Sequence, residues 1–85
     1  MAKVRIFTTT YCSYCDRAKA FMKEKGIAYE EVDVTGNDAA RDELVRKSHG
    51  RKTVPQIFIG DEAIGGYTDL IALDQAGQLT PKLSA

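Results

Sequence analysis

The chain has 85 residues, of which 44% are hydrophobic and 28% are charged, and its 12 basic and 12 acidic side chains give zero formal net charge. This length predicts one domain, residues 1–85, with a modest core. Balanced charge argues against nucleic acid or an anionic membrane as the main partner, because both are bound by basic excess. No apolar run approaches the ~20 residues that cross a bilayer, and charges interrupt the N-terminal apolar residues, unlike in a signal peptide. We therefore expect a cytoplasmic protein.

The first half of the chain alternates between strand and helix patterns. Residues 3–8 alternate apolar and charged side chains, as a half-buried strand does. A helix is expected over residues 13–25, where apolar side chains recur every three or four positions before a glycine stop. Residues 27–34 predict a second strand. The turn and cap residues 35–38 then open a second helix that ends near residue 47.

The second half predicts a hairpin and a further helix. Residues 48–52 form a basic loop, and residues 56–59 are a short buried strand. The turn at residues 60–61 pairs that strand with residues 62–64 in an antiparallel hairpin. A third helix is expected over residues 67–76, with one more helical turn in the tail. The order β-α-β-α-β-β-α predicts an α/β fold in which three helices flank a four-stranded mixed sheet, because the first β-α-β unit requires parallel strands.

The only cysteines, Cys12 and Cys15, lie where the first strand gives way to the first helix. At the helix start, free backbone N–H groups and the helix dipole favour a thiolate, so the pKa of Cys12 is expected below its usual value. Cys15 lies one turn further along the same face, within reach of a disulfide bond. We therefore expect Cys12 to attack and Cys15 to resolve.

Other uses of a Cys-x-x-Cys pair have less support in this sequence. Zinc takes about four ligands, and the pair with one distant histidine supplies too few. Covalent haem attachment requires a histidine after the second cysteine, where the chain has Asp16. A structural disulfide across so short a loop contributes only about 2 kcal/mol, and a pair of inert core thiols is the remaining alternative. A Cys-x-x-Cys near a β-α-β pattern favours redox chemistry.

Three motifs, taken in order, resemble those of the glutaredoxin family. They are Cys12-Ser13-Tyr14-Cys15 after the first strand, Thr53-Val54-Pro55 before the third strand, and Gly65-Gly66-Tyr67-Thr68-Asp69 after the fourth. The resemblance covers nearly the whole chain and is nearest to the small bacterial dithiol members. It implies a thioredoxin fold, a cis peptide bond between Val54 and Pro55, and glutathione-dependent thiol–disulfide exchange.

The resemblance also implies a set of glutathione-binding residues. Val54 would offer its backbone N–H and C=O to an extended thiol peptide, and the start of the third helix would bind a carboxylate. Asp69 would either take the ammonium group of glutathione or act only as a helix cap. Arg51 or Lys52 would take the glycine carboxylate, unless both belong to a solvated loop. The full expected set is Tyr14, Arg51, Lys52, Thr53, Val54, Pro55, Gly66, Tyr67, Thr68 and Asp69, with Gly66 allowing close approach of the ligand.

The implied activity is the reduction of protein–glutathione mixed disulfides and of protein disulfides by a monomer, with glutathione reductase recycling the oxidised glutathione. Two positions depart from the family: Ser13 replaces the commonest proline, and Thr9 replaces a frequent lysine. Members with a small residue in place of that proline sometimes hold a [2Fe–2S] cluster between two subunits. A cluster-binding dimer held through Cys12 and glutathione is therefore the alternative function, and no other metal site is expected. A third hypothesis is a thioredoxin-like reductase that receives its electrons from a flavoenzyme. The glutathione-binding motifs argue against it.

Overall fold

The computed structural model describes residues 2–84 and contains one sheet with strand order β2-β1-β3-β4. The elements are β1 (Val4–Thr8), α1 (Ser13–Glu24), β2 (Glu30–Asp33), α2 (Asp38–Lys47), β3 (Gln56–Ile59), β4 (Glu62–Gly65), α3 (Tyr67–Gln75) and α4 (Leu79–Leu83). Strand β1 pairs in parallel with β2 and antiparallel with β3, and β3 pairs antiparallel with β4. The predicted four-stranded mixed sheet is confirmed, and the expected last turn forms a fourth, short helix. None of the helices within residues 2–84 is long and apolar enough to span a membrane.

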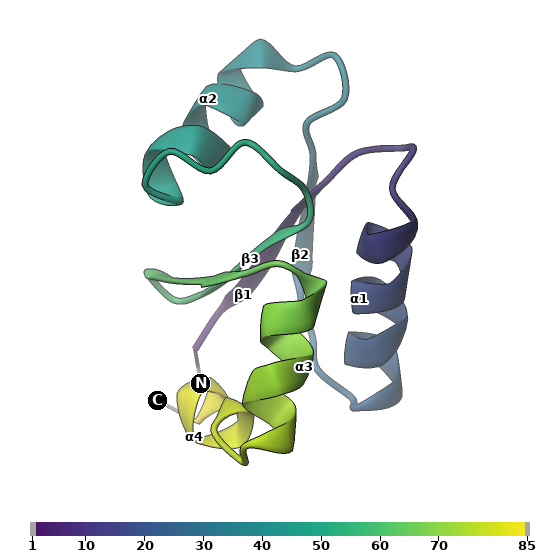
Figure 1. Cartoon of the computed structure of the whole chain (residues 1–85), viewed down its shortest axis with the longest axis vertical. Coiled ribbons are helices and arrows are strands. Elements are labelled where there is room, and N and C mark those ends of the chain that lie inside the picture. The colour runs from purple at the N-terminus through teal and green to yellow at the C-terminus, as the bar shows by residue number, and fades with distance from the viewer. Residues whose placement is uncertain (1, 85) are drawn as a thin grey trace.

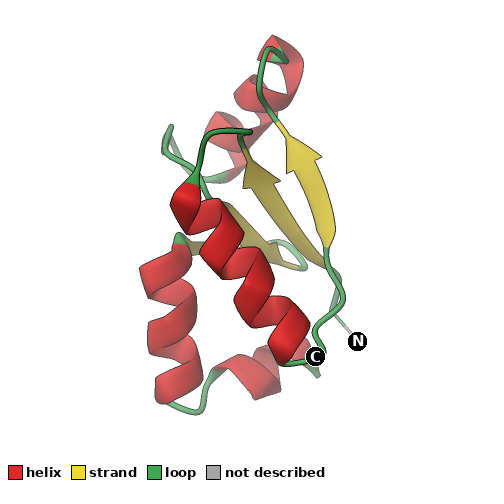
Figure 2. Cartoon of the chain, turned by 90° about the vertical axis from the view of Figure 1, so that its right-hand side faces the viewer, coloured by secondary structure: helices red, strands yellow, loops and turns green. Residues whose placement is uncertain are grey.

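Helices cover both faces of the sheet (Figure 1). Alternating side chains of a strand point to opposite faces. Strands β1 and β3 therefore each contribute side chains to two apolar clusters, one on each face of the sheet. The cluster against α1, α3 and α4 contains Val4, Ile6, Ala18, Met22, Ile57, Ile59, Leu70 and Leu79. The cluster against α2 contains Phe7, Val34, Leu44 and Phe58. Figure 2 shows α1 and α3 lying side by side over the first of these faces.

Strand β2 is shorter than the sequence pattern predicts, because the end of α1 takes part of the expected strand. Gly26 has φ +72°, and the backbone N–H of Ile27 donates to the carbonyl of Met22 at 2.8 Å. This bond, together with a left-handed glycine, is the Schellman arrangement that satisfies the last carbonyls of a helix. Residues 27–29 therefore complete the helix end and the turn, and strand pairing begins only at Glu30.

The strand directions bring three connections to one edge of the sheet. The last part of β1 lies beside the first residue of β3, since Phe7 pairs with Gln56. The end of β4 lies at the same edge, since Gly65 pairs with Ile57. The segments that follow β1, precede β3 and follow β4 are the three that carry the motifs, so the fold places the motifs together.

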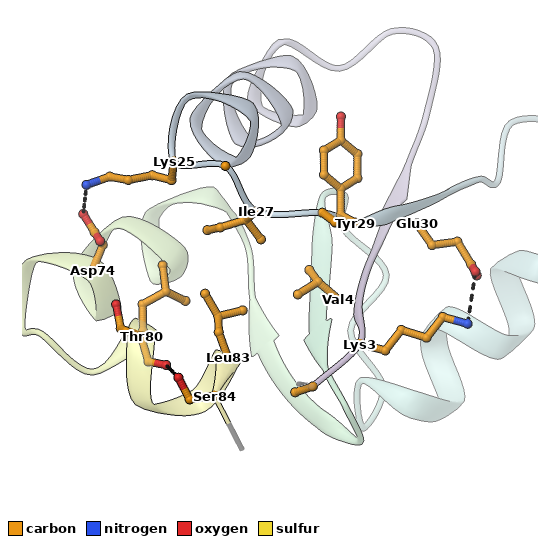
Figure 3. A pocket seen from close by; sticks show the side chains of 14 residues that line it. Lys3, Val4, Lys25, Ile27, Tyr29, Glu30, Asp74, Thr80, Leu83 and Ser84 are labelled. Carbon is orange, nitrogen blue, oxygen red and sulfur yellow. Dashed lines mark hydrogen bonds and ion pairs between the residues drawn. The ribbon is translucent and has the colours of Figure 1, made fainter.

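A cavity of about 630 Å³ lies at the opposite edge, where β1 and β2 begin and α4 packs (Figure 3). Apolar side chains such as Val4, Ile27 and Leu83 line it, and the ion pair between Lys25 and Asp74 (3.6 Å) lies beside them. None of the lining residues belongs to the three motifs, so this cavity is separate from the cysteines.

Candidate active site

The two cysteines differ sharply in their surroundings. Cys12 is the N-cap residue of α1, with an extended backbone (φ −143°, ψ 102°), and its Sγ accepts the backbone N–H of Cys15 at 3.0 Å. Cys12 is partly exposed, whereas Cys15 is completely buried. The two form a disulfide bond with Cα atoms 5.2 Å apart. Cys12 is therefore open to solvent at a helix start, while Cys15 has no exposed surface.

The loop that leads into Cys12 is held by the turn that follows β2. Thr10 donates both its backbone N–H (2.9 Å) and its hydroxyl (3.0 Å) to the Oγ1 of Thr35. The N–H of Thr35 in turn donates to the Asp33 carboxylate at 2.8 Å, and this bond lowers the pKa of Asp33. The backbone just before Cys12 is thus fixed to the turn that follows β2.

A polar network ties α1 to the two parallel strands. The buried hydroxyl of Thr8 donates to Glu31 at 2.7 Å, and the ammonium of Lys19 lies 3.0 Å from the same carboxylate oxygen. The Thr8 hydroxyl is the main cause that lowers the pKa of Glu31, and Glu31 raises the pKa of Lys19. No pattern in the sequence indicates this three-way contact.

The predicted cis peptide bond between Val54 and Pro55 is present. Val54 is half-buried and Pro55 is buried, at the edge where β3 begins. The side-chain amide of Gln56 donates to the hydroxyl of Thr53 at 3.1 Å. A Cβ built on Gly66 would lie 3.5 Å from the carbonyl oxygen of Pro55, so the motif before β3 and the motif after β4 are neighbours.

Asp69 holds the start of α3 and also meets a cation. Its Oδ2 accepts the backbone N–H of Gly66 at 2.9 Å, the N3-to-N-cap bond of a capping box. The guanidinium of Arg51 lies 3.8 Å from the same oxygen. Of the two roles that the sequence offers for Asp69, the cap is present in the structure, and the ligand contact stays a prediction.

Gly65 has a structural duty that sequence reasoning missed. Its φ of +114° is a conformation that side-chain-bearing residues rarely adopt. A Cβ at this position would collide with the Asp69 carboxylate and lie 2.9 Å from a nitrogen of Arg51. The family resemblance implies close approach of a ligand at Gly66 and gives Gly65 no role of its own.

Tyr11 and Tyr14 flank Cys12 in the sequence, and Tyr14 contacts the start of α3. The rings of Tyr14 and Tyr67 are 6.1 Å apart, and the guanidinium of Arg17 lies 5.3 Å from the centre of the Tyr14 ring. Tyr14 is 52% exposed and Tyr11 is 95% exposed. The expected binding residues Tyr14 and Tyr67 are thus brought together, whereas Tyr11 was not predicted to take part.

Other expected residues have fewer contacts. Lys52 and Thr68 are exposed, and no ion pair involves Lys52 within residues 2–84. His49, with φ +61°, lies in the loop after α2. In the described part of the chain, no three His, Cys, Asp or Glu side chains group together as metal ligands would.

Comparison with known proteins identifies the family. The glutaredoxin family model matches residues 4–64. Glutaredoxin 3 of Escherichia coli K12 is 51% identical over 98% of this chain and 99% of its own length, and Pseudomonas aeruginosa glutaredoxin is 47% identical over the full length of both. The buckwheat glutaredoxin–glutathione complex is similar with a TM-score of 0.86, at 31% identity over 98% of this chain and 77% of that one. The chain therefore belongs to the glutaredoxin family of thiol–disulfide oxidoreductases and carries the thioredoxin fold, with Cys12 and Cys15 as its redox-active pair.

Proposed function

We propose that this protein is a glutathione-dependent oxidoreductase that reduces protein–glutathione mixed disulfides and protein disulfides. Cys12 is the nucleophile and Cys15 is the resolving thiol. The observation that carries the proposal is the asymmetry of the pair: Cys12 caps α1 and is partly exposed, whereas Cys15 is fully buried. The Cys15 N–H at 3.0 Å from Sγ supports negative charge on Cys12, both as nucleophile and as leaving group.

The reaction proceeds by successive thiol–disulfide exchanges. The Cys12 thiolate attacks the glutathione sulfur of a mixed disulfide, and the protein thiolate leaves. A second glutathione thiolate attacks that same glutathione sulfur, giving oxidised glutathione and free Cys12. Alternatively, Cys15 attacks Cys12, releases glutathione and closes the disulfide, which two further glutathiones reduce. Glutathione reductase would return the oxidised glutathione to its thiol form.

The proposed glutathione site lies along the edge that joins the three motifs. Val54 would pair its backbone with the ligand as an added strand does, and Gly66 would let the ligand pass close to Pro55. The N-terminus of α3, with Thr68 and Tyr67, would receive a carboxylate. The remaining contacts proposed are Tyr14, Arg51, Lys52, Thr53 and Asp69. Support comes from the buckwheat relative, which was crystallised in complex with glutathione.

Paired cysteine variants test the proposal. Activity is followed on cysteine–glutathione mixed disulfide and on a protein disulfide, with glutathione, glutathione reductase and NADPH as the recycling system. Cys12→Ser should abolish both activities, because no other accessible thiol is present. Cys15→Ser should keep deglutathionylation while losing most reduction of the protein disulfide. Activity that survives in Cys12→Ser would refute the assignment.

The alternative function, binding of a [2Fe–2S] cluster, rests on Ser13 in place of proline. One chain offers only Cys12 as an accessible thiol, and residues 2–84 contain no group of three metal-binding side chains. A cluster would therefore require Cys12 from two chains together with glutathione. Purification without air decides between the two functions. We expect a colourless monomer, whereas a brown dimer that loses its colour in Cys12→Ser would establish the alternative.

We further infer a single catalytic domain that works as a monomer in the cytoplasm. A reducing compartment supplies the glutathione thiol that the cycle consumes. Size-exclusion chromatography with light scattering, run on reduced and oxidised protein, tests the monomer. Fractionation of the source cells with an antibody tests the location.

A further inference from the structure

Two large tyrosine rings lie exposed beside the nucleophile. Tyr11 (95% exposed) and Tyr14 (52% exposed) are the exposed large hydrophobic side chains within residues 2–84. They occupy the position directly before Cys12 and the second position after it. Exposed apolar side chains that gather at one place mark interaction surfaces. We call this pair the aromatic surface.

The two rings differ in what they touch. The Tyr14 ring lies 6.1 Å from the ring of Tyr67, the first residue of α3, and the Arg17 guanidinium lies 5.3 Å from the centre of the Tyr14 ring. Tyr14 therefore packs against the start of α3. Within the described residues, no aromatic ring or cation packs on Tyr11. We therefore expect a small ligand bound at α3 and Val54 to contact Tyr14. The Tyr11 ring stays free to contact a larger substrate.

Tyr11 is presented on a backbone that is fixed on both sides. Thr10 is bound through two hydrogen bonds to Thr35, and Cys12 is fixed as the cap of α1. Ordering this segment therefore costs little when a partner binds, which is how a rigid aromatic residue contributes most to affinity. Tyrosine is also among the residues enriched at binding hot spots.

We propose that Tyr11 is a specificity residue that contacts polypeptide substrates and is not used by small disulfides. The partner is a polypeptide segment with an apolar side chain next to its reacting cysteine, which covers the Tyr11 ring as Cys12 attacks. This proposal rests on the proposed function, because it concerns the same reaction at Cys12. Continuity with Cys12 sets the occupant: a chain that carries either sulfur of the disulfide under attack is brought next to Cys12, and therefore next to the adjacent Tyr11.

Three glutathione-bearing substrates separate the contact of Tyr11 with an apolar peptide side chain from the exchange reaction at Cys12. They are cysteine–glutathione mixed disulfide, a pentapeptide with leucine on both sides of an S-glutathionylated cysteine, and the same peptide with serine in place of leucine. The variants are Tyr11→Ala and the matched control Tyr11→Phe, which keeps the ring. Thermal unfolding of each variant establishes that the fold is unchanged, as expected for a 95% exposed side chain.

We expect the wild type to prefer the leucine peptide over the serine peptide by about tenfold in kcat/KM, a difference of ~1.4 kcal/mol. Tyr11→Ala should lose that preference while its kcat/KM for cysteine–glutathione changes by less than about twofold. Tyr11→Phe should keep the preference, because the ring supplies the apolar contact. Equal use of both peptides by the wild type, or an equal loss on all three substrates, would overturn the proposal.

A second measurement does not depend on glutathione. Reduced Cys15→Ser protein is mixed with the two peptides carrying thionitrobenzoate on their cysteine. The Cys12 sulfur bonds to the peptide sulfur, and the yellow thionitrobenzoate thiolate leaves and is counted by its absorbance. The same leucine preference, lost in Cys15→Ser with Tyr11→Ala, supports the inference even if no glutathione turnover is found. If no preference is found here, the proposed role of Tyr11 is refuted, while the proposed glutathione reaction is unaffected.

Discussion

Arg51 and Asp69, for which the family resemblance implies contacts with opposite charges of glutathione, lie 3.8 Å from one another. Both side chains are about half exposed, at 50% and 49%. An exposed pair of this kind contributes at most about 1 kcal/mol. A ligand that brings both an ammonium and a carboxylate can therefore replace the pair at small cost. In the free protein, each of the two residues restrains the side chain of the other.

Asp69→Asn separates the charge of this residue from its capping role. The amide oxygen of asparagine can still accept the Gly66 N–H, so stability should fall by less than about 0.5 kcal/mol. The lost charge should raise the KM for glutathione about tenfold, equivalent to ~1.4 kcal/mol. Glutathione titrations in the coupled assay and urea unfolding measure the two effects.

Asp69→Ala is the matched control, because it removes both the charge and the cap. It should match Asp69→Asn in KM but cost about 1 kcal/mol more in the free energy of unfolding. An unchanged KM in both variants would show that Asp69 is only a helix cap.

Gly65→Ala should be far more damaging than Gly66→Ala, although the residues are adjacent. A side-chain-bearing residue at a φ of +114° costs about 1–3 kcal/mol, and the new Cβ would displace the Asp69 carboxylate from its cap. At Gly66, with φ −93°, a Cβ makes only an ordinary 3.5 Å contact with Pro55. Urea unfolding of both variants tests the order, and equal losses would contradict it.

The sequence was sufficient for the fold because its signals were local. Strand alternation, the Asn37 cap and the glycine after α1 each act within a few residues, and the strand directions then follow from the β-α-β order. The contacts of Thr8, Glu31 and Lys19 join segments that are distant in the sequence, so no local pattern predicts them. The requirement for glycine at position 65 depends on where the side chains of Asp69 and Arg51 meet, which only the folded structure shows.

The Thr8 hydrogen bond to Glu31 should make stability depend on pH. The bond lowers the pKa of Glu31 below its ordinary value of 4.5, so its contribution is full above 4.5 and disappears as the pH falls through the lowered folded-state pKa. Thr8→Val removes the hydroxyl without changing the shape of the side chain. It should cost about 1 kcal/mol at pH 7 and clearly less at pH 2.5, measured by urea unfolding.

Glu31→Gln provides the control for this pH effect. In that background the carboxylate is absent, so Thr8→Val should cost the same at both pH values. A pH-independent loss in the background that retains Glu31 would instead mean that Thr8 acts only through packing.

Ser13→Pro should stabilise the protein. Ser13 is exposed and is the first residue of α1, where proline is preferred because the N–H has no partner inside the helix. The extended backbone of Cys12 (φ −143°, ψ 102°) leaves room for a following proline ring. The gain should be about 0.4–1 kcal/mol, or roughly 2–8 °C in Tm.

The same substitution tests how the helix start acts on the nucleophile. Ser13→Pro removes one of the free N–H groups at the start of α1, which Cys12 caps, while the Cys15 N–H at 3.0 Å remains. The pKa of Cys12 in the reduced protein should therefore rise, although it should stay below that of an ordinary cysteine because the remaining donor and the helix dipole still act. Ultraviolet absorbance of the thiolate, followed against pH with Cys12→Ser as the blank, measures it. A pKa that does not move would show that the Ser13 N–H has no part in stabilising the thiolate.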